Sequence, residues 1–265
     1  TLLLNLLALW KQESLSPMTK EERQAPRPSF KKAWADFNSG GAAGQLLAVV
    51  ALGTLAFSMQ DVLLEPYGGE ILDLSVASTT MLTASWALGA LVGFFYAAVA
   101  MRRNKKPVIL AAIAAGFGIM GFSGVIFADP FGLISLFYIS TTFIGFGAGL
   151  FAVSTLTIAM ALPLALGAGR GLALGAWGAA QATAGGLGVA LGGGLRDFVN
   201  SIALDGTLGA TLAHSNTGYS FVYHTEIALL FLTLLAIGPL TRLVFNKESD
   251  DQGKLTKLGL AELPS

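Results

Sequence analysis

The sequence lacks cysteine, has only two histidines and is poor in charge. The 265-residue chain carries 16 basic and 16 acidic side chains, so its formal net charge is zero, and charged residues make up 12% of it. The missing cysteines exclude disulfides, thiolate metal sites and cysteine nucleophiles, and two histidines argue against a transition-metal site built by the protein. The absence of a basic excess argues against nucleic acid as a partner.

Catalytic motifs are missing as well. The sequence contains no P-loop, no HExxH motif and no nucleophile elbow, and its glycine-rich stretches lie inside apolar segments. The run GAGRG at 167–171 joins two apolar segments without a preceding strand, so we interpret it as a tight turn rather than a phosphate-binding loop. We therefore assign no catalytic residue and expect a protein that is not an enzyme.

Apolar residues are abundant. Hydrophobic residues supply 54% of the chain and there are 33 glycines, whereas the charged share is well below the roughly 25% typical of soluble domains. Six apolar stretches are long enough to cross a bilayer as helices, and none shows the strict alternation of a membrane β-strand. They are residues 44–62, 76–101, 108–127, 131–162, 171–195 and 221–245. The sequence thus predicts an all-α integral membrane protein with six transmembrane helices.

The basic residues predict the orientation of these spans. Fifteen of the 16 lie in segments that the six spans place on one side, and Arg196 alone lies on the other. Because basic residues concentrate in cytoplasmic loops, we expect both ends of the six-helix unit to be cytoplasmic.

The spans divide the chain into four parts. Residues 1–10 are apolar but would rise only about 13 Å as a helix, so we interpret them as the end of a preceding transmembrane helix. A cytoplasmic loop at 11–43, the six-helix bundle at 44–245 and a cytoplasmic tail at 246–265 follow. Within the loop, aromatic residues at 30, 34 and 37 indicate either a short helix on the membrane surface or a linker that carries aromatics.

Polar residues within the spans are the first candidates for a binding site, because burying them in lipid is costly. Asp61 and Glu65, preceded by Gln60, would share one helix face near the outer surface. They could relay protons, hold a cation or pair with Arg196; alternatively, Glu65 lies at a solvated helix end while Asp61 has a buried partner.

Further candidates lie in other spans. Gln181 is near the middle of its span with Trp177 one turn before it, and its amide needs a partner that is either another helix or a ligand. His224 and Glu226 open the last span, where His224 would either make an interfacial hydrogen bond or ligate the magnesium of a chlorophyll-type pigment. Trp86 completes the candidate pigment or substrate site.

The fifth span is rich in glycine. Small residues three or four apart let membrane helices pack closely, and we favour this interpretation over a flat wall for a large planar ligand or a moving helix. The predicted packing positions are Gly171, Gly175, Gly178, Gly185, Gly188 and Gly192.

Several longer motifs resemble a known family. They are LGTLAFSMQDVLLEPYGGE at 52–70, GFGAGLFAVSTLT at 145–157, GLALGAWGAAQAT at 171–183, and GYSFVYHTE at 218–226 continuing to IGPL at 237–240. Together they resemble the PucC/LhaA family of purple phototrophic bacteria, a branch of the major facilitator superfamily. The resemblance covers nearly all of residues 1–245 and implies the C-terminal half of a twelve-helix bundle.

The resemblance also implies a function. Proteins of this family are associated with the assembly of light-harvesting antenna complexes in the inner, intracytoplasmic photosynthetic membrane, with bacteriochlorophyll as the pigment handled or delivered. The partners implied are antenna polypeptides, the reaction centre–antenna complex and membrane lipids. Two alternatives remain open: a facilitator-type transporter of a small solute, proton-coupled through Asp61 or Glu65, and a chaperone that binds antenna polypeptides without pigment.

Overall fold

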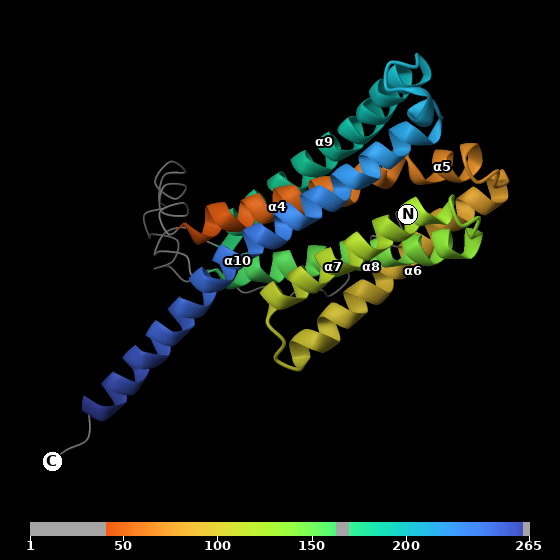
Figure 1. Ribbon diagram of the computed structural model, residues 1–265. Coiled ribbons are helices and arrows are strands. Elements are labelled where there is room, and N and C mark those ends of the chain that lie inside the picture. Colours follow the sequence, from red (N-terminus) through yellow and green to blue (C-terminus); the bar gives the residue numbers. More distant parts are fainter. Residues whose placement is uncertain (1–40, 163–169, 262–265) are drawn as a thin grey trace, which may run out of the picture.

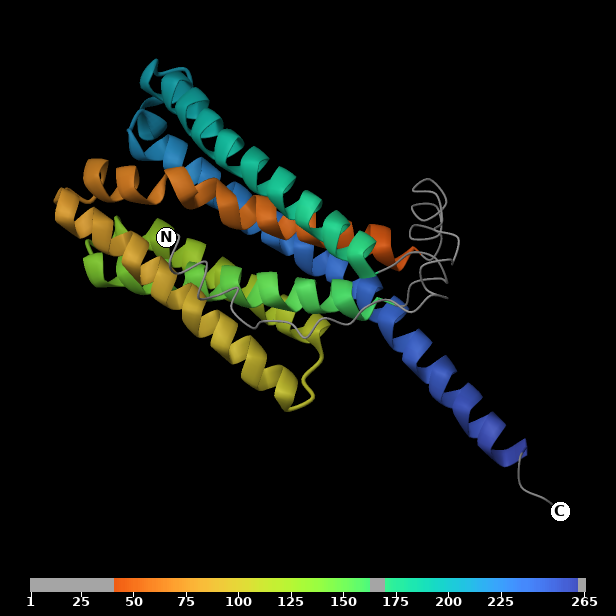
Figure 2. The same cartoon turned by 180° about the vertical axis from the view of Figure 1, so that it is seen from behind.

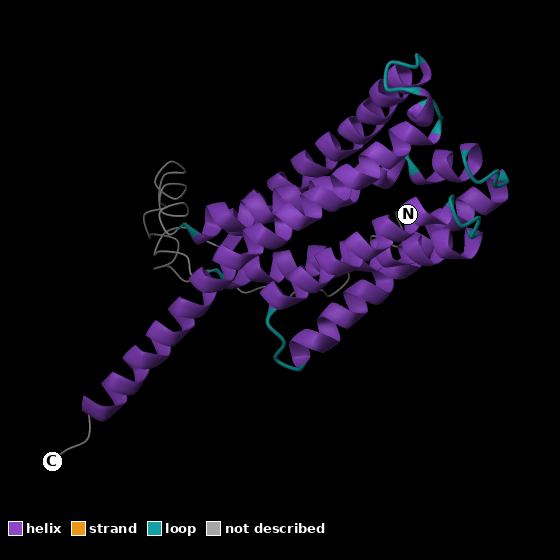
Figure 3. Cartoon of the chain, viewed as in Figure 1, coloured by secondary structure: helices purple, strands orange, loops and turns teal. Residues whose placement is uncertain are grey.

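The computed structural model describes residues 41–162 and 170–261 (Figure 1), with side chains up to Thr241. The segment predicted to end a preceding helix at 1–10, most of the loop predicted at 11–43, and the proposed turn at 167–169 lie outside these ranges. Every regular element in the described part is helical (Figure 3), which confirms the prediction of an all-α chain for those residues.

Six long helices form the described part of the bundle. They are α4 (Ala42–Met59), α6 (Val76–Arg102), α7 (Pro107–Ala128), α8 (Ile134–Ala161), α9 (Arg170–Leu204) and α10 (Asn216–Ala261). Three short elements, η1 (Gln60–Val62), α5 (Leu64–Glu70) and η2 (Ala210–Leu212), occupy the connections. Seen from both sides, α9 and α10 lie beside α4, while α6 and α7 lie beside α8 (Figures 1 and 2). The bundle therefore has two layers joined through α4, α7, α8 and α10.

Five of these helical segments are long and apolar enough to cross a membrane. They are Ala42–Glu70, Val76–Arg102, Pro107–Ala128, Ile134–Ala161 and Asn216–Thr241. The sixth predicted span, 171–195, lies within α9, which runs the length of the bundle (Figure 1). The mean hydropathy of this helix is lower than that of the five segments, because glycine occupies many positions where they carry larger apolar side chains.

Because successive helices run in opposite directions, basic and acidic residues gather at opposite ends of the bundle. Arg102, Arg103, Lys105 and Lys106 lie at the α6–α7 turn, which we call the basic end of the bundle. Acidic residues lie at the opposite, acidic end, in or beside the α5–α6, α7–α8 and α9–α10 connections: Glu70, Asp73, Asp129, Asp197 and Asp205.

Local sequence explains where α6 begins and ends and where α7 begins. The Ser75 side chain accepts a hydrogen bond from the backbone N–H of Ser78 at 3.3 Å and so caps the start of α6. After α6, Asn104 takes a left-handed conformation with φ of 57°, which this residue type tolerates. Pro107 then occupies the first turn of α7, where its missing N–H costs no helical hydrogen bond.

Two GxxxG motifs bring α6 and α8 into close contact. A Cβ atom at Gly89 or Gly93 on α6 would collide with the α8 backbone, and one at Gly145 or Gly149 on α8 would collide with the α6 backbone. Close approach through small residues replaces the hydrophobic driving force that is missing between helices in lipid. The two helices are therefore held by backbone-to-backbone packing.

Several predicted boundaries differ from the structure. The first span, predicted at 44–62, is interrupted after Met59 by η1 and then continues as α5 to Glu70. The fifth, predicted to end at 195, continues to Leu204. Of the tail predicted at 246–265, residues 246–261 continue α10 as a helix that extends away from the bundle (Figure 1), beyond the candidate membrane span that ends at Thr241.

Candidate functional site

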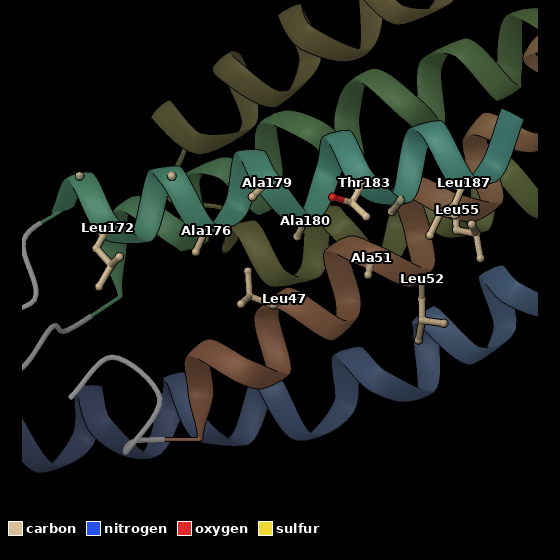
Figure 4. Close-up of a pocket in the computed structure, with 13 residues that line it drawn as sticks. Leu47, Ala51, Leu52, Leu55, Leu172, Ala176, Ala179, Ala180, Thr183 and Leu187 are labelled. Atoms are coloured by element: carbon tan, nitrogen blue, oxygen red, sulfur yellow. The ribbon is translucent and has the colours of Figure 1, made fainter. Parts of the chain in front are cut away.

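A long apolar groove runs between α4 and α9 and has a volume of about 710 Å³. Its α4 side consists of Leu47, Ala51, Leu52 and Leu55. Its α9 side consists of Gly171, Leu172, Gly175, Ala176, Ala179, Ala180, Thr183, Ala184 and Leu187. Figure 4 shows side chains from the two helices lining this space, among which Thr183 carries the one side-chain oxygen. The α9 side is nearly flat, because most of its residues are glycine or alanine.

The glycines of α9 divide into two groups. A Cβ atom at Gly188 would lie 2.9 Å from the Leu55 carbonyl oxygen, and one at Gly192 would collide with the Met59 backbone. At Gly171, Gly175 and Gly178, by contrast, a Cβ atom would meet no described atom within 4 Å; Gly185 has only ordinary contacts with Ser58 and Thr54. Close packing with α4 is therefore confined to the part of α9 toward the acidic end, and the glycines nearer the basic end leave open space.

The polar candidates on α6 and α9 have different surroundings. Trp177 donates a hydrogen bond from its indole nitrogen to the Thr155 hydroxyl on α8 at 3.2 Å. Gln181 is half-buried and makes no hydrogen bond within the described ranges. The Trp86 indole nitrogen is enclosed and has no partner among the described residues. None of the three lines the groove.

Arg196 joins three elements at the acidic end. Its guanidinium forms ion pairs with Glu70 of α5 and with the neighbouring Asp197. It also donates a hydrogen bond to the Tyr219 hydroxyl and lies 4.4 Å from the centre of that ring. The Tyr219 hydroxyl in turn donates to Glu70 at 2.8 Å. The pairing of Arg196 with Asp61 or Glu65, considered above, is thus not what the structure shows; Glu70, five residues after Glu65 on α5, is the partner.

Removing this junction should destabilise the acidic end. We expect Arg196→Gln to lower the free energy of unfolding by about 1–2 kcal/mol, because it removes charge-assisted hydrogen bonds and a cation–π contact, partly offset by the exposure of Glu70. Asp197→Asn should cost less than about 0.5 kcal/mol, because that carboxylate is 70% exposed. Equilibrium unfolding in detergent measures both, and equal losses would contradict a special role for Arg196.

Asp61 and Glu65 do not lie on one continuous helix. The interruption at η1 separates them, and both side chains are exposed. Asp61 accepts a hydrogen bond from the neighbouring Gln60 amide at 2.5 Å, and Glu65 accepts one from the Thr83 hydroxyl at 2.6 Å. The partner of Asp61 is thus the buried Gln60 amide, as expected, although Asp61 itself is exposed, and an exposed Glu65 agrees with the interpretation as a helix end.

His224 and Glu226 lie on opposite sides of α10. His224 is exposed, and its Nδ1 lies 2.6 Å from the carbonyl oxygen of Ser220 in the same helix. Because a carbonyl only accepts, Nδ1 carries the proton in the neutral ring and Nε2 keeps its lone pair. Glu226 is completely buried, and neither of its carboxylate oxygens has a hydrogen-bond partner among the described residues. Its burial was not foreseen, since the sequence placed it at the membrane surface.

The chain matches the family model described as "PUCC protein" over residues 1–245. It is 50% identical over its full length to an uncharacterised protein of the puhA–bchM intergenic region of Rhodobacter capsulatus, of which it covers 55%. It is 46% identical over 75% of its length to protein PucC of Rhodovulum sulfidophilum, of which it covers 44%. A more distant relative, 27% identical over 77% of the chain and covered to 48%, is named bacteriochlorophyll synthase 44.5 kDa chain of Rhodobacter capsulatus.

The chain therefore spans about half the length of these curated relatives. No solved structure matches it.

Proposed function

The chain belongs to the PUCC protein family, and from this premise we propose that it acts in a membrane assembly factor for bacterial light-harvesting antenna complexes. In this role it handles bacteriochlorophyll, or delivers it to antenna polypeptides, without covalent chemistry. The observation that carries the proposal is the groove between α4 and α9. Its volume is within the range of small-molecule sites, and its flat, apolar α9 side suits a large planar pigment.

His224 is a second candidate contact for the pigment. Histidines that ligate a metal usually donate their other ring N–H to a carbonyl or carboxylate, and the bond to Ser220 satisfies that condition. The exposed ring leaves Nε2 accessible as a ligand for the magnesium at the centre of the pigment. Ala228, exposed one turn further along α10, adds little bulk beside it.

We place the protein in the inner, intracytoplasmic membrane of a phototrophic bacterium, with the basic end cytoplasmic as the positive-inside rule implies. The six long helices would then form the C-terminal half of a facilitator-type twelve-helix bundle. Apolar side chains that α6 exposes, such as Leu91 and Phe95, would contact lipid, antenna polypeptides or the reaction centre–antenna complex.

The test is a purification of the full-length protein from pigmented membranes, followed by an absorption spectrum. We expect bacteriochlorophyll to copurify, and antenna complexes to be lost when the gene is deleted. If pigment never copurifies and antenna complexes assemble normally in the deletion strain, the proposal is wrong. Crosslinks from α9 to antenna helices without any bound pigment would instead favour a chaperone for the polypeptides alone.

A facilitator-type transporter is the second candidate, because Gln181 is half-buried without a hydrogen-bond partner among the described residues and Asp61 is exposed. Facilitator substrates bind near the membrane midplane. In this case Asp61→Asn would abolish counterflow of a solute in proteoliposomes while antenna assembly continues.

A histidine variant tests the pigment contact on α10. We expect His224→Leu to reduce the copurified bacteriochlorophyll severalfold, because leucine fills similar space without a lone pair for magnesium. His214→Leu, which changes the other histidine in the α9–α10 connection, should leave the pigment content unchanged. An equal pigment content in all three proteins would show that His224 is not a ligand.

A further inference from the structure

Three enclosed polar side chains with unpaired oxygen atoms lie where α10 meets η1. Glu226 and Tyr223 are 0% exposed and Gln60 is 1% exposed. Both carboxylate oxygens of Glu226, the Tyr223 hydroxyl and the Gln60 side-chain oxygen have no hydrogen-bond partner within the described residues. Native proteins leave few buried polar groups unpaired, so such a concentration of them requires an explanation.

These groups belong to one neighbourhood. Gln60 and Asp61 are the polar neighbours of Glu226 from η1, and Tyr223 lies one turn before Glu226 on the same face of α10. Tyr223 also contacts the rings of Tyr67 and Phe122, with centroids 5.5 and 6.3 Å away. Glu226 therefore lies enclosed where α10 faces η1. Asp61 is the residue of η1 that connects this place with the protein surface.

No described cation neutralises Glu226. The titratable and charged groups on α10 and on the elements around it toward the acidic end are Asp61, Glu65, Tyr67, Glu70, Asp129, Arg196, Asp197, Asp205, His214, Tyr219, Tyr223 and His224, the last of which is exposed on the opposite side of α10. Arg196, the cation of this set, binds Glu70 and Asp197, and Asp129 accepts a hydrogen bond from Asn216. The Gln60 backbone N–H is the donor that faces Glu226, and no hydrogen bond of good geometry to either carboxylate oxygen forms within the described residues. An ionised carboxylate enclosed without a cation is costly enough that such a group takes up a proton instead.

We propose that Glu226 is a buried proton-binding site that exchanges its proton with the surface through Asp61. A proton needs no added space or ligands, and the described residues contain no group of three or more His, Asp or Glu that could hold a metal ion. On release, the proton leaves the Glu226 carboxyl for the Asp61 carboxylate and then for water. Because the charge left on Glu226 must be solvated, release requires η1 and α10 to separate.

This inference goes beyond the proposed function and does not depend on pigment. In this proposal, the protonation of Glu226 is coupled to the packing of α10 against the end of α4. The chain thereby contains an element with two arrangements, closed when Glu226 is protonated and open when it is ionised.

Infrared spectroscopy of the purified full-length protein tests the proposal directly. We expect a protonated-carboxyl C=O band at neutral pH that shifts on transfer to heavy water and is absent in Glu226→Gln. Glu65→Gln, the same change at an exposed carboxylate, should retain the band. A spectrum of Glu226→Gln identical to that of the unmodified protein, or a band abolished by sodium ions, would overturn the proposal.

Stability gives a second measurement. Because glutamine replaces a neutral acid of the same size, Glu226→Gln should fold normally; a Glu226→Gln protein that fails to fold while Glu65→Gln folds would contradict a neutral Glu226.

Discussion

Replacing Gly145 with leucine is expected to prevent stable folding of the bundle. A Cβ atom at this position would collide with the Trp86 carbonyl oxygen and lie 2.9 Å from its carbonyl carbon. The obstructing atoms belong to the α6 backbone, so they cannot move aside as a flexible side chain can. Overpacking costs about 1–3 kcal/mol in adaptable cores and more where the surroundings are rigid, and we expect at least about 3 kcal/mol here.

The measurement is the yield of monodisperse protein in detergent, with unfolding followed by circular dichroism where material is recovered. Gly116→Leu on α7 is the matched control, because a Cβ atom there meets no described atom within 4 Å. Gly145→Ala should already be destabilising, since the first added carbon makes the collision. A stable Gly145→Leu protein would show that α6 and α8 are not held by close backbone contact.

The sequence predicts helices best where their ends carry strong local signals. The spans expected at 76–101 and 108–127 differ by one residue at most at each end from Val76–Arg102 and Pro107–Ala128. A serine cap, a basic turn and a proline define these ends, and each acts through neighbouring backbone atoms alone. Such signals can be read without knowing the tertiary structure.

The position of Glu226 depends on where α10 begins, and this helix start lacks such local signals. The last span was expected to begin at 221, which places Glu226 in the second helical turn beside the membrane surface. The helix instead begins at Asn216, so Glu226 lies about three turns inside it. Five polar or small residues, from Asn216 to Ser220, begin the helix without raising its hydropathy.

Pairing between distant elements is also not readable from the sequence. Asp61 and Glu65 were the candidate partners of Arg196 in the sequence, and the actual partner, Glu70, lies beyond the interruption at η1, at the end of α5. The glycine pattern of α9 is similarly ambiguous. Identical residues contact α4 at Gly192 and leave open space at Gly175, because only part of α9 lies close to α4.

Filling the groove should separate pigment handling from folding. Gly175 lines the groove, and a Cβ atom there would meet no described atom within 4 Å. We therefore expect Gly175→Phe to fold with unchanged stability while its ring occupies the space proposed for the pigment. Copurified bacteriochlorophyll should fall at least about tenfold, which corresponds to the loss of about 1.4 kcal/mol of binding free energy.

Gly186→Phe is the matched control for this experiment. It makes the same change on the same helix, at another glycine with no described atom within 4 Å, but outside the groove lining. Pigment content by absorption, normalised to protein, should then decrease in Gly175→Phe and be preserved in Gly186→Phe. Equal pigment in the two variants would exclude the groove as the pigment site. Because neither change alters His224, a residual pigment fraction that His224→Leu then removes would place the remaining contact on α10.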